Sequence, residues 1–332
     1  GEPMEIKRSI KRSFAVLGAI GMLVLAGCGG GSGGGGTAAK TEKPGIVKLV
    51  EEKGKNLTVN TVKLKYVVLA SEVKKLKPPS YMPTLVYQKD AFYGIDKATK
   101  SMVKLVIKDG TFVVENANVI PNVQYIFGTD GENIYYRPEG KMPTPRVLTK
   151  DGKDGGSLFK NYYAYVSPAK DGKTAFAWSN SGAILKLKKK ADGTFEDPRR
   201  PFPYLPKEDM YVTAGWFDVG TDTFFVRGRQ KSRKQDQPLR EHRFDGTLKT
   251  TYGQIGPRQN GTYAILKDYV INARFNGAGY DIYSRSDGKV KGNIPLQTFG
   301  TNTTLMAPVV DNTFVICDSF RDVPKLIVLT IK

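Results

Sequence analysis

Few residues of this 332-residue chain could take part in catalysis. His242 is the only histidine, and it is expected in a charged loop, which disfavours a serine–histidine–aspartate or cysteine–histidine arrangement. A histidine-rich metal site is excluded. Asp218, in the run GWFDV, is the only acid that we can place near the centre of the predicted fold, whereas glycosidases commonly use two carboxylates. Because the chain also lacks a phosphate-binding glycine loop and a dinucleotide fingerprint, we expect a non-enzymatic protein with no cofactor and no metal.

The strongest candidate for binding is an arginine-rich loop. Residues 227–243 carry seven basic and two acidic side chains, and the nearby segment 196–209 adds two arginines and aromatic residues. Arginine can contact phosphate or carboxylate with two parallel hydrogen bonds, and an aromatic ring could stack on a sugar or a peptide. We predict a binding patch made of Arg199, Arg200, Arg227, Arg229, Arg233, Arg240, Arg243, Phe202 and Tyr204. The alternative is a solvated surface loop without a partner.

The N-terminal residues carry the features of an export signal. A basic start at residues 7–12 precedes an apolar run at residues 14–25, and these 12 residues are too few to span a bilayer. The run ends in Leu25-Ala26-Gly27-Cys28, which resembles the lipobox of bacterial lipoproteins. The resemblance implies removal of residues 1–27 and attachment of a lipid to Cys28. An ordinary signal peptide with a chance cysteine is the alternative.

The segment after Cys28 predicts a flexible tether. Residues 29–36 read GGGSGGGG, and a chain this rich in glycine behaves as a random coil. We therefore divide the chain into a signal peptide (1–27), a lipidated linker (28–44) and a folded domain (45–332). With Cys28 lipidated, Cys317 has no partner for an internal disulfide, and its apolar run FVICDSF predicts that it packs as a small hydrophobic residue.

The net charge of the chain indicates which classes of partner it could bind. The net charge is +19, and the leader holds only four basic and two acidic residues, so most of the excess belongs to the folded domain. Such a field attracts acidic glycans, polymer phosphates, lipid headgroups or an acidic protein face. An export signal argues against nucleic acid as the physiological partner. We expect a monomer that is tied to a membrane by its lipid.

The rest of the chain predicts a repeated antiparallel β structure. From residue 84 onward, short runs rich in Val, Ile, Tyr, Phe and Thr alternate with turn residues. One strand type recurs at AFYGI (91–95), NIYYR (133–137), TAFAW (174–178), TFFVR (223–227), YVINA (269–273) and TFVIC (313–317). Asp-Gly pairs, which suit tight hairpins, follow in phase at Asp109, Asp151, Asp192, Asp245 and Asp287. A period of about 40–50 residues with two markers in register is typical of a β-propeller of four-stranded blades.

The sixth repeat lacks an outer strand, because it has no Asp-Gly turn after its third strand. The unassigned segment 57–69 is strand-like, and we predict that it pairs with residues 325–331 and closes the ring. This gives an all-β fold of six four-stranded blades, with five or seven as alternatives. The segment FYGIDKATKSMVKL (92–105) resembles the quinoprotein-type repeat, and residues 133–155 resemble the repeats of TolB-like propellers found in bacterial lipoproteins. Each resemblance covers one blade.

Two functions remain open from the sequence. The first is a membrane-anchored extracytoplasmic lipoprotein, at the outer membrane or cell surface, whose propeller face binds a protein or an anionic envelope polymer. The alternative is a carbohydrate-active propeller enzyme, a hydrolase or lyase, that acts on acidic glycans. Two acids facing each other in the central channel would favour the enzyme, and a channel lined by apolar and small residues would favour the binding protein.

Overall fold

The computed structural model describes residues 42–77, 85–179, 183–198, 210–230, 237–253, 262–274, 279–300, 305–318 and 325–332. The chain divides into two compact units, Gly1–Glu42 and Lys43–Lys332, and all but one of the described residues belong to the second. Within the described part of this unit, α1 (Gly45–Lys53) is the single α-helix, η1 (Leu296–Thr298) is a 3-10 turn, and the other regular elements are strands. The predicted all-β class is confirmed.

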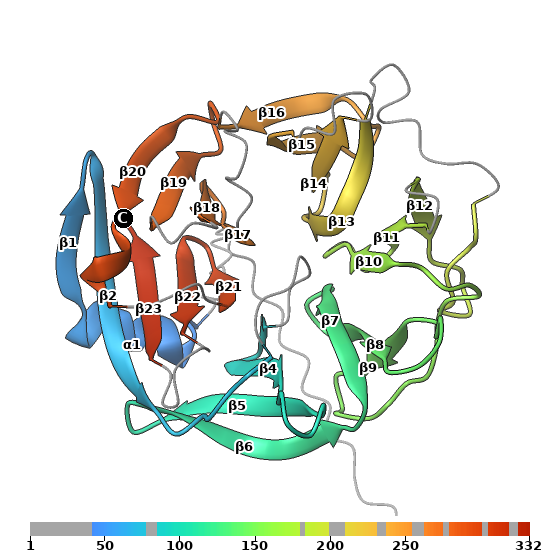
Figure 1. The fold of residues 1–332 in the computed structure, drawn as a ribbon, viewed down its shortest axis with the longest axis horizontal. Coiled ribbons are helices and arrows are strands. Elements are labelled where there is room, and N and C mark those ends of the chain that lie inside the picture. The colour runs from blue at the N-terminus through green and yellow to red at the C-terminus, as the bar shows by residue number, and fades with distance from the viewer. Residues whose placement is uncertain are drawn as a thin grey trace, which may run out of the picture. The chain divides into compact units, whose positions relative to one another are not determined.

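The strands follow one another in antiparallel groups around a ring (Figure 1). We number these groups as the six predicted repeats. Repeat 1 holds β3 (Val86–Gln88), β4 (Ala91–Ile95), β5 (Met102–Lys108) and β6 (Thr111–Ile120). Repeat 2 holds β7 (Val123–Thr129), β8 (Ile134–Pro138) and β9 (Arg146–Leu148), and repeat 3 holds β10 (Tyr165–Pro168), β11 (Thr174–Trp178) and β12 (Ile184–Lys188).

The second half of the chain continues the same order. Repeat 4 holds β13 (Met210–Val219), β14 (Thr223–Gln230), β15 (Leu239–Arg243) and β16 (Leu248–Tyr252). Repeat 5 holds β17 (Thr262–Ile265), β18 (Tyr269–Ala273), β19 (Tyr280–Ser284) and β20 (Val290–Ile294). Repeat 6 holds β21 (Leu305–Val310), β22 (Thr313–Cys317) and β23 (Leu326–Ile331). Every predicted marker strand is thus the second strand of its repeat.

The predicted Asp-Gly turns are present, since Gly110, Gly152, Gly193, Gly246 and Gly288 all have a positive φ. Two expected outer strands are shorter than predicted. After the turns of repeats 2 and 3, the described residues make single bridges, Leu148 with Asp154 and Lys189 with Phe195, in place of a fourth strand. The sequence explains this difference, because Gly155, Gly156 and Pro198 follow these turns and such residues weaken or end a ladder.

The ring is closed by a strand from the start of the described unit. Residues 64–69 of β2 (Val62–Ser71) pair antiparallel with β23, from Leu64 opposite Ile331 to Leu69 opposite Leu326. This confirms the predicted closure, except that residues 57–59 belong to β1 (Lys55–Val59), which pairs with β2 itself. The end of β2 also pairs in parallel with β6 at Ala70 and Ser71, which was not predicted. Because β2 joins repeats 1 and 6, the described strands form five hydrogen-bonded sheets, and the number of blades stays a prediction.

The hydrophobic core is distributed between neighbouring repeats. Side chains of β4 and β8 meet between repeats 1 and 2, and aromatic rings of β11 and β14 stack between repeats 3 and 4, with Phe176 and Phe224 at 4.3 Å between ring centroids. Helix α1 adds Ile46, Val47 and Val50 to the cluster shared by repeats 1 and 6. Each sheet buries both faces against its neighbours, so the inner strands are left to line the centre of the ring.

Candidate functional site

The inner strands of all six repeats end at a cavity in the middle of the ring. The cavity has a volume of about 320 Å³, and residues of β3, β7, β10, β13, β17 and β21 line it. A smaller cavity of about 170 Å³ adjoins it and shares the lining residues Lys170, Asp218, Val219, Pro308 and Val309. Small-molecule sites are commonly concave and about 300–1,000 Å³ in volume. The two cavities, which we call the central cavity, are therefore the candidate site.

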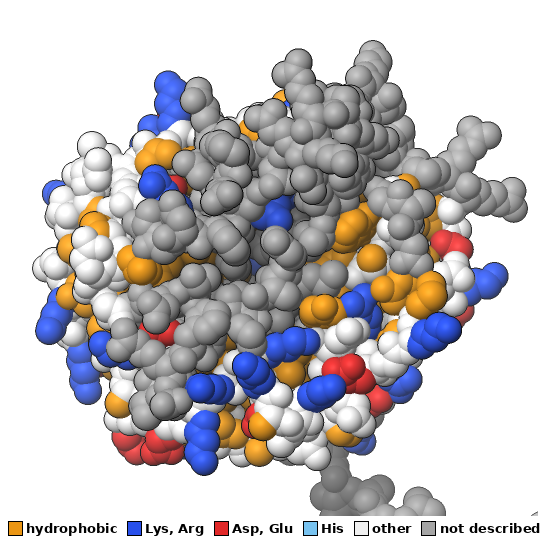
Figure 2. Space-filling view, in the orientation of Figure 1, with side chains coloured by type: hydrophobic (Ala, Val, Ile, Leu, Met, Phe, Trp, Pro, Cys, Tyr) orange, Lys and Arg blue, Asp and Glu red, His pale blue; other side chains and the backbone are white. Residues whose placement is uncertain are grey.

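The lining of the central cavity is mixed in character. Apolar side chains such as Phe127, Met306 and Val309 lie beside the polar side chains of Gln88, Thr129 and Ser167. The charged lining residues are Lys89, Lys170, Lys267, Arg285, Asp218 and Asp311. Basic residues therefore outnumber acidic ones, in keeping with the surface of the described unit, where basic side chains are widespread (Figure 2).

Asp218 lies in this cavity, as the sequence predicted for the one acid of the inner strands. Burial raises the pKa of the Asp218 carboxyl above its ordinary value, although the nearby positive charges of Lys170 and Arg285 act in the opposite direction. A carboxyl with a raised pKa is protonated over a wider pH range, and a protonated carboxyl can donate a hydrogen bond. Asp218 can therefore act toward a ligand as an acceptor or as a donor.

The central cavity lies at one end of the inner strands. Most of its lining residues come from the last positions of these strands, such as Gln88, Thr129 and Pro168, or from the turns that lead to the second strands. Arg243 of the predicted patch lies at this same end, because it is the last residue of β15 and pairs with Thr223, the first residue of β14. Arg229 lies toward the other end, where it pairs with Tyr211 near the start of β13.

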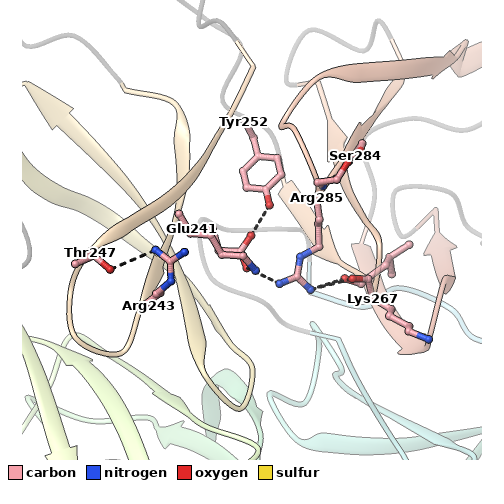
Figure 3. A network of polar contacts seen from close by, with 10 residues as sticks. Glu241, Arg243, Thr247, Tyr252, Lys267, Ser284 and Arg285 are labelled. Atoms are coloured by element: carbon pink, nitrogen blue, oxygen red, sulfur yellow. Dashed lines mark hydrogen bonds and ion pairs between the residues drawn. The ribbon is translucent and has the colours of Figure 1, made fainter.

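A buried network of polar side chains connects repeats 4 and 5 beside the cavity (Figure 3). The Glu241 side chain is fully buried, and its Oε1 accepts a hydrogen bond from Arg285 Nη2 at 2.5 Å. Its Oε2 accepts from Tyr252 Oη at 2.5 Å, and Lys249 Nζ donates to Oε1 at 3.0 Å. Arg285 also donates to the carbonyl oxygens of Leu266 and Lys267, and its guanidinium lies 5.1 Å from the centroid of the Phe225 ring.

These contacts determine the protonation states of Glu241 and Arg285. Burial raises the pKa of the Glu241 carboxyl, but the hydrogen bonds from Arg285, Tyr252 and Lys249 and the charge of Arg285 together lower it by more, so the net shift is downward. Burial alone would lower the pKa of the Arg285 guanidinium, and the hydrogen bond to Glu241, the charge of Glu241 and the contact with Tyr252 together reverse this into a net increase. The pair is therefore ionised at neutral pH. Most of the charge that Arg285 brings to the cavity wall is balanced from behind by Glu241.

The structure describes only some of the predicted binding residues. Arg199, Arg200, Phe202, Tyr204 and Arg233 lie outside the described residues. The predicted loop bounds were wrong, because β14 continues to Gln230 and β15 begins at Leu239. The long strand β13 causes this, since it offers partners to Gly228, Arg229 and Gln230.

The described arginines are separated by these strands. Arg227 lies within β14 with 3% of its surface exposed, so its side chain does not belong to a solvated loop. Arg240 is half-buried on β15, whereas Arg243 is exposed and donates to Thr247 Oγ1 at 3.4 Å. Binding by the patch stays a prediction.

His242 was wrongly expected in a loop. It lies on β15 and is buried, its Nδ1 lies 3.2 Å from the carbonyl oxygen of Gly246, and its ring stacks on Phe224. Cys317 is buried in β22 as predicted, and burial and the charge of Asp318 raise the pKa of its thiol to about 12. Over the described ranges, the structure has no cluster of three or more metal-ligating side chains and no helix that meets the length and hydropathy of a membrane span.

The sequence prediction missed four basic residues of the central cavity. Lys89, Lys170 and Lys267 follow an inner strand by one or two residues and precede an aspartate. This Lys-Asp pair could have indicated the three lysines from the sequence alone, because it recurs at the same place in three repeats. Arg285 had no comparable signal, since its partner Glu241 belongs to another repeat.

Comparison with known proteins supports the fold. No family model matches the chain, and no curated protein matches its sequence. Among solved structures, a protein of unknown function from Bacteroides thetaiotaomicron matches with a TM-score of 0.50 and 8% identity over 80% of this chain and 76% of that chain. A gluconolactonase from Xanthomonas campestris matches with a TM-score of 0.50 and 11% identity, over 82% of this chain and 91% of that chain. A streptogramin B lyase matches with a TM-score of 0.51 and 9% identity, over 83% of this chain and all of that chain. The similarity shows a propeller-like fold, and the identities are too low to show a shared activity.

Proposed function

We propose that this chain is a lipid-anchored binding protein of the cell envelope, whose propeller binds a protein or an anionic envelope polymer outside the cytoplasm. The lipobox-like residues 25–28 and the glycine-rich segment 29–36 support the anchoring. A flexible tether of residues 29–44 has a root-mean-square length of about 20–24 Å, so it would keep the compact unit Lys43–Lys332 near the membrane. The outer membrane or the cell surface is the expected location.

The observation that carries the proposed binding is the charge of the central cavity. Lys89, Lys170 and Lys267 line it against two acidic residues, and the further charge of Arg285 is largely balanced by Glu241. A concave site with low-dielectric walls concentrates the field of such charges and attracts anions. The net charge of +19 on the chain acts in the same direction at longer range.

Capture from native envelope tests this function. The full chain, purified in a non-ionic detergent, is incubated with envelope extract, and we expect it to retain an anionic polymer or a protein with an acidic face. Substituting Lys170→Gln should weaken this capture by at least about tenfold, because one charged contact is commonly worth about 1.5–3 kcal/mol. Lys173→Gln is the matched control, since Lys173 is exposed in the same turn and does not line the cavity.

Two further variants separate the parts of the proposal. Cys28→Ser should move the protein from the membrane pellet to the soluble fraction while leaving capture intact. The triple variant Arg229→Glu, Arg233→Glu, Arg240→Glu tests the predicted arginine patch. Retention of Cys28→Ser in the pellet, or equal capture by all variants that alter the two candidate sites, would contradict the proposal.

A carbohydrate-active enzyme is the second candidate, and one observation favours it. Asp218 and Asp311 both line the smaller cavity, and glycoside hydrolysis uses two carboxylates, one of them with a raised pKa. Two of the structural neighbours are a gluconolactonase and a lyase. Release of sugar fragments from an acidic glycan by the purified chain, abolished by Asp218→Asn, would establish the enzyme in place of the binding protein.

A further inference from the structure

A Lys-Asp pair marks the first turn of alternate repeats. It occurs at residues 89–90 in repeat 1, 170–171 in repeat 3 and 267–268 in repeat 5. In the corresponding turns of repeats 2 and 4 the aspartate is preceded by threonine, and in repeat 6 by valine. A ring that places lysine in every second repeat distributes three of them around its centre.

All three lysines line the central cavity. Lys89 and Lys170 line the larger part, and Lys170 and Lys267 line the smaller part. Each side chain is exposed, and among the described residues none of the three makes an ion pair or a side-chain hydrogen bond. Their charges are therefore available to a ligand at the mouth of the cavity.

The aspartates of the same turns are engaged elsewhere. Asp90 accepts a hydrogen bond from Tyr87 Oη at 2.9 Å, Asp171 accepts from Thr174 Oγ1 at 2.9 Å, and Asp268 accepts from Asn312 Nδ2 at 2.8 Å. Asp90 and Asp171 thus stabilise their own turns, and Asp268 connects its turn to that of the next repeat, in each case by a hydrogen bond from a neutral donor. The negative charge next to each lysine in sequence is not used to pair that lysine.

The turns that carry Lys170 and Lys267 are also fixed to their neighbours. The backbone N–H of Lys170 donates to the carbonyl oxygen of Gly220 in repeat 4, and that of Lys267 donates to the carbonyl oxygen of Asp311 in repeat 6. These bonds hold successive first turns together around the cavity. A ligand site built on them loses less conformational entropy on binding.

We propose that Lys89, Lys170 and Lys267 form a cationic rim that binds a phosphomonoester group at the central cavity. This deepens the proposed function, on which it rests, by naming the anionic group that the propeller recognises. A phosphomonoester presents three terminal oxygens and close to two negative charges, whereas a carboxylate presents two oxygens and one charge. Three separate ammonium groups therefore match the phosphomonoester better.

Titration calorimetry tests the rim directly. The full chain in non-ionic detergent is titrated with glycerol 3-phosphate, inorganic phosphate and acetate in about 0.15 M salt, where exposed charges act over only about 8 Å. We expect saturable binding of the two phosphates and none of acetate. Vesicles with and without a phosphomonoester lipid then show whether a lipid headgroup is accepted as well as the free group.

A matched pair of triple variants gives the control. Lys89→Gln, Lys170→Gln, Lys267→Gln removes the rim, and Lys108→Gln, Lys173→Gln, Lys289→Gln removes three exposed lysines that lie in or next to turns at the same end of the ring. Both variants have the same net charge and should unfold at the same temperature as the unaltered chain. We expect the first variant to lose saturable phosphate binding and the second to keep it. Asp218→Asn should bind at least as tightly as the unaltered chain, because it removes a negative charge from the cavity.

The outcomes separate this inference from the proposed function. Polymer capture that survives loss of the rim would keep the function and overturn the phosphomonoester site. Phosphate binding without any capture from envelope would keep the site and overturn the function. Equal binding of phosphate and acetate, equal loss in both triple variants, or no phosphate binding by the unaltered chain would each overturn the rim.

Discussion

Replacing Arg285 with methionine is expected to lower the free energy of unfolding by about 3–5 kcal/mol, the usual cost of removing one partner from a buried ion pair. The substitution leaves the Glu241 carboxylate fully buried with Tyr252 and Lys249 as its remaining partners. It also removes two hydrogen bonds to the carbonyl oxygens of Leu266 and Lys267. Because the contact between Arg285 and Glu241 joins repeats 4 and 5, its loss affects the packing of both.

The double variant Arg285→Met, Glu241→Met should recover part of this loss, because it removes both charges and keeps similar volumes. Arg146→Met is the matched control. Arg146 forms an ion pair with Asp154 at 2.8 Å, but both side chains are more than a third exposed, so the expected cost is below about 1 kcal/mol. Chemical denaturation followed by circular dichroism measures the free energy of unfolding of Arg285→Met, the double variant and Arg146→Met. Equal effects of Arg285→Met and Arg146→Met would contradict the importance of the buried network.

The same network predicts how stability depends on pH. The folded-state pKa of Glu241 is lowered, so its contribution is present above the unfolded pKa of about 4.3 and is lost as the pH falls through the lower folded value. Arg285 stays protonated throughout this range. We therefore expect the unaltered chain to lose more stability than the Arg285→Met variant between neutral pH and about pH 3. Parallel curves for the two proteins would exclude this contribution.

Removing the closing strand is expected to abolish cooperative folding. A chain that lacks residues 1–71 loses α1, β1 and β2, and leaves the edge of β23 without its partner. These elements contain seven buried hydrophobic residues, and burying each contributes about 1.5–3 kcal/mol. The sum is comparable to the whole stability of a typical domain, which is about 5–15 kcal/mol.

A chain that lacks only residues 1–42 is the control, since the compact unit Lys43–Lys332 is then complete. We expect this control to unfold in one sharp transition and the longer deletion to show none in thermal and chemical denaturation. Aggregation of the longer deletion is also expected, because an exposed edge strand can pair with other chains. A sharp transition at the same midpoint in both chains would show that closure by β2 is dispensable.

Much of the fold could be predicted from the sequence, because the patterns that indicate it are local and repeated. The marker strands and the Asp-Gly turns recur in register, and a turn conformation depends mainly on the residues within it. Closure by residues 64–69 was predictable from a missing outer strand, since the repeat pattern itself shows what is absent. Even the shortened ladders of repeats 2 and 3 have a local cause in glycine and proline.

The candidate site was harder to predict from the sequence, because its contacts join residues that are distant in sequence. Glu241 and Arg285 belong to different repeats, and nothing near either residue indicates the other. The parallel contact of β2 with β6 depends on how the first and last sheets meet. Asp218 could be placed in the centre because it lies on an inner strand. The importance of Lys89, Lys170 and Lys267 becomes clear only when their shared cavity is known.

The closing strand also sets the order of events during synthesis. Residues 62–71 leave the ribosome early, whereas their partner at residues 326–331 follows roughly 10–50 s later at usual rates of translation. Until then β2 can pair with β1 and β6 but not with β23, so intermediates carry an open edge. Contacts of such long sequence separation also slow folding. We therefore expect ring formation to be the last step of folding, and chaperones that protect open strand edges to raise the yield of this protein.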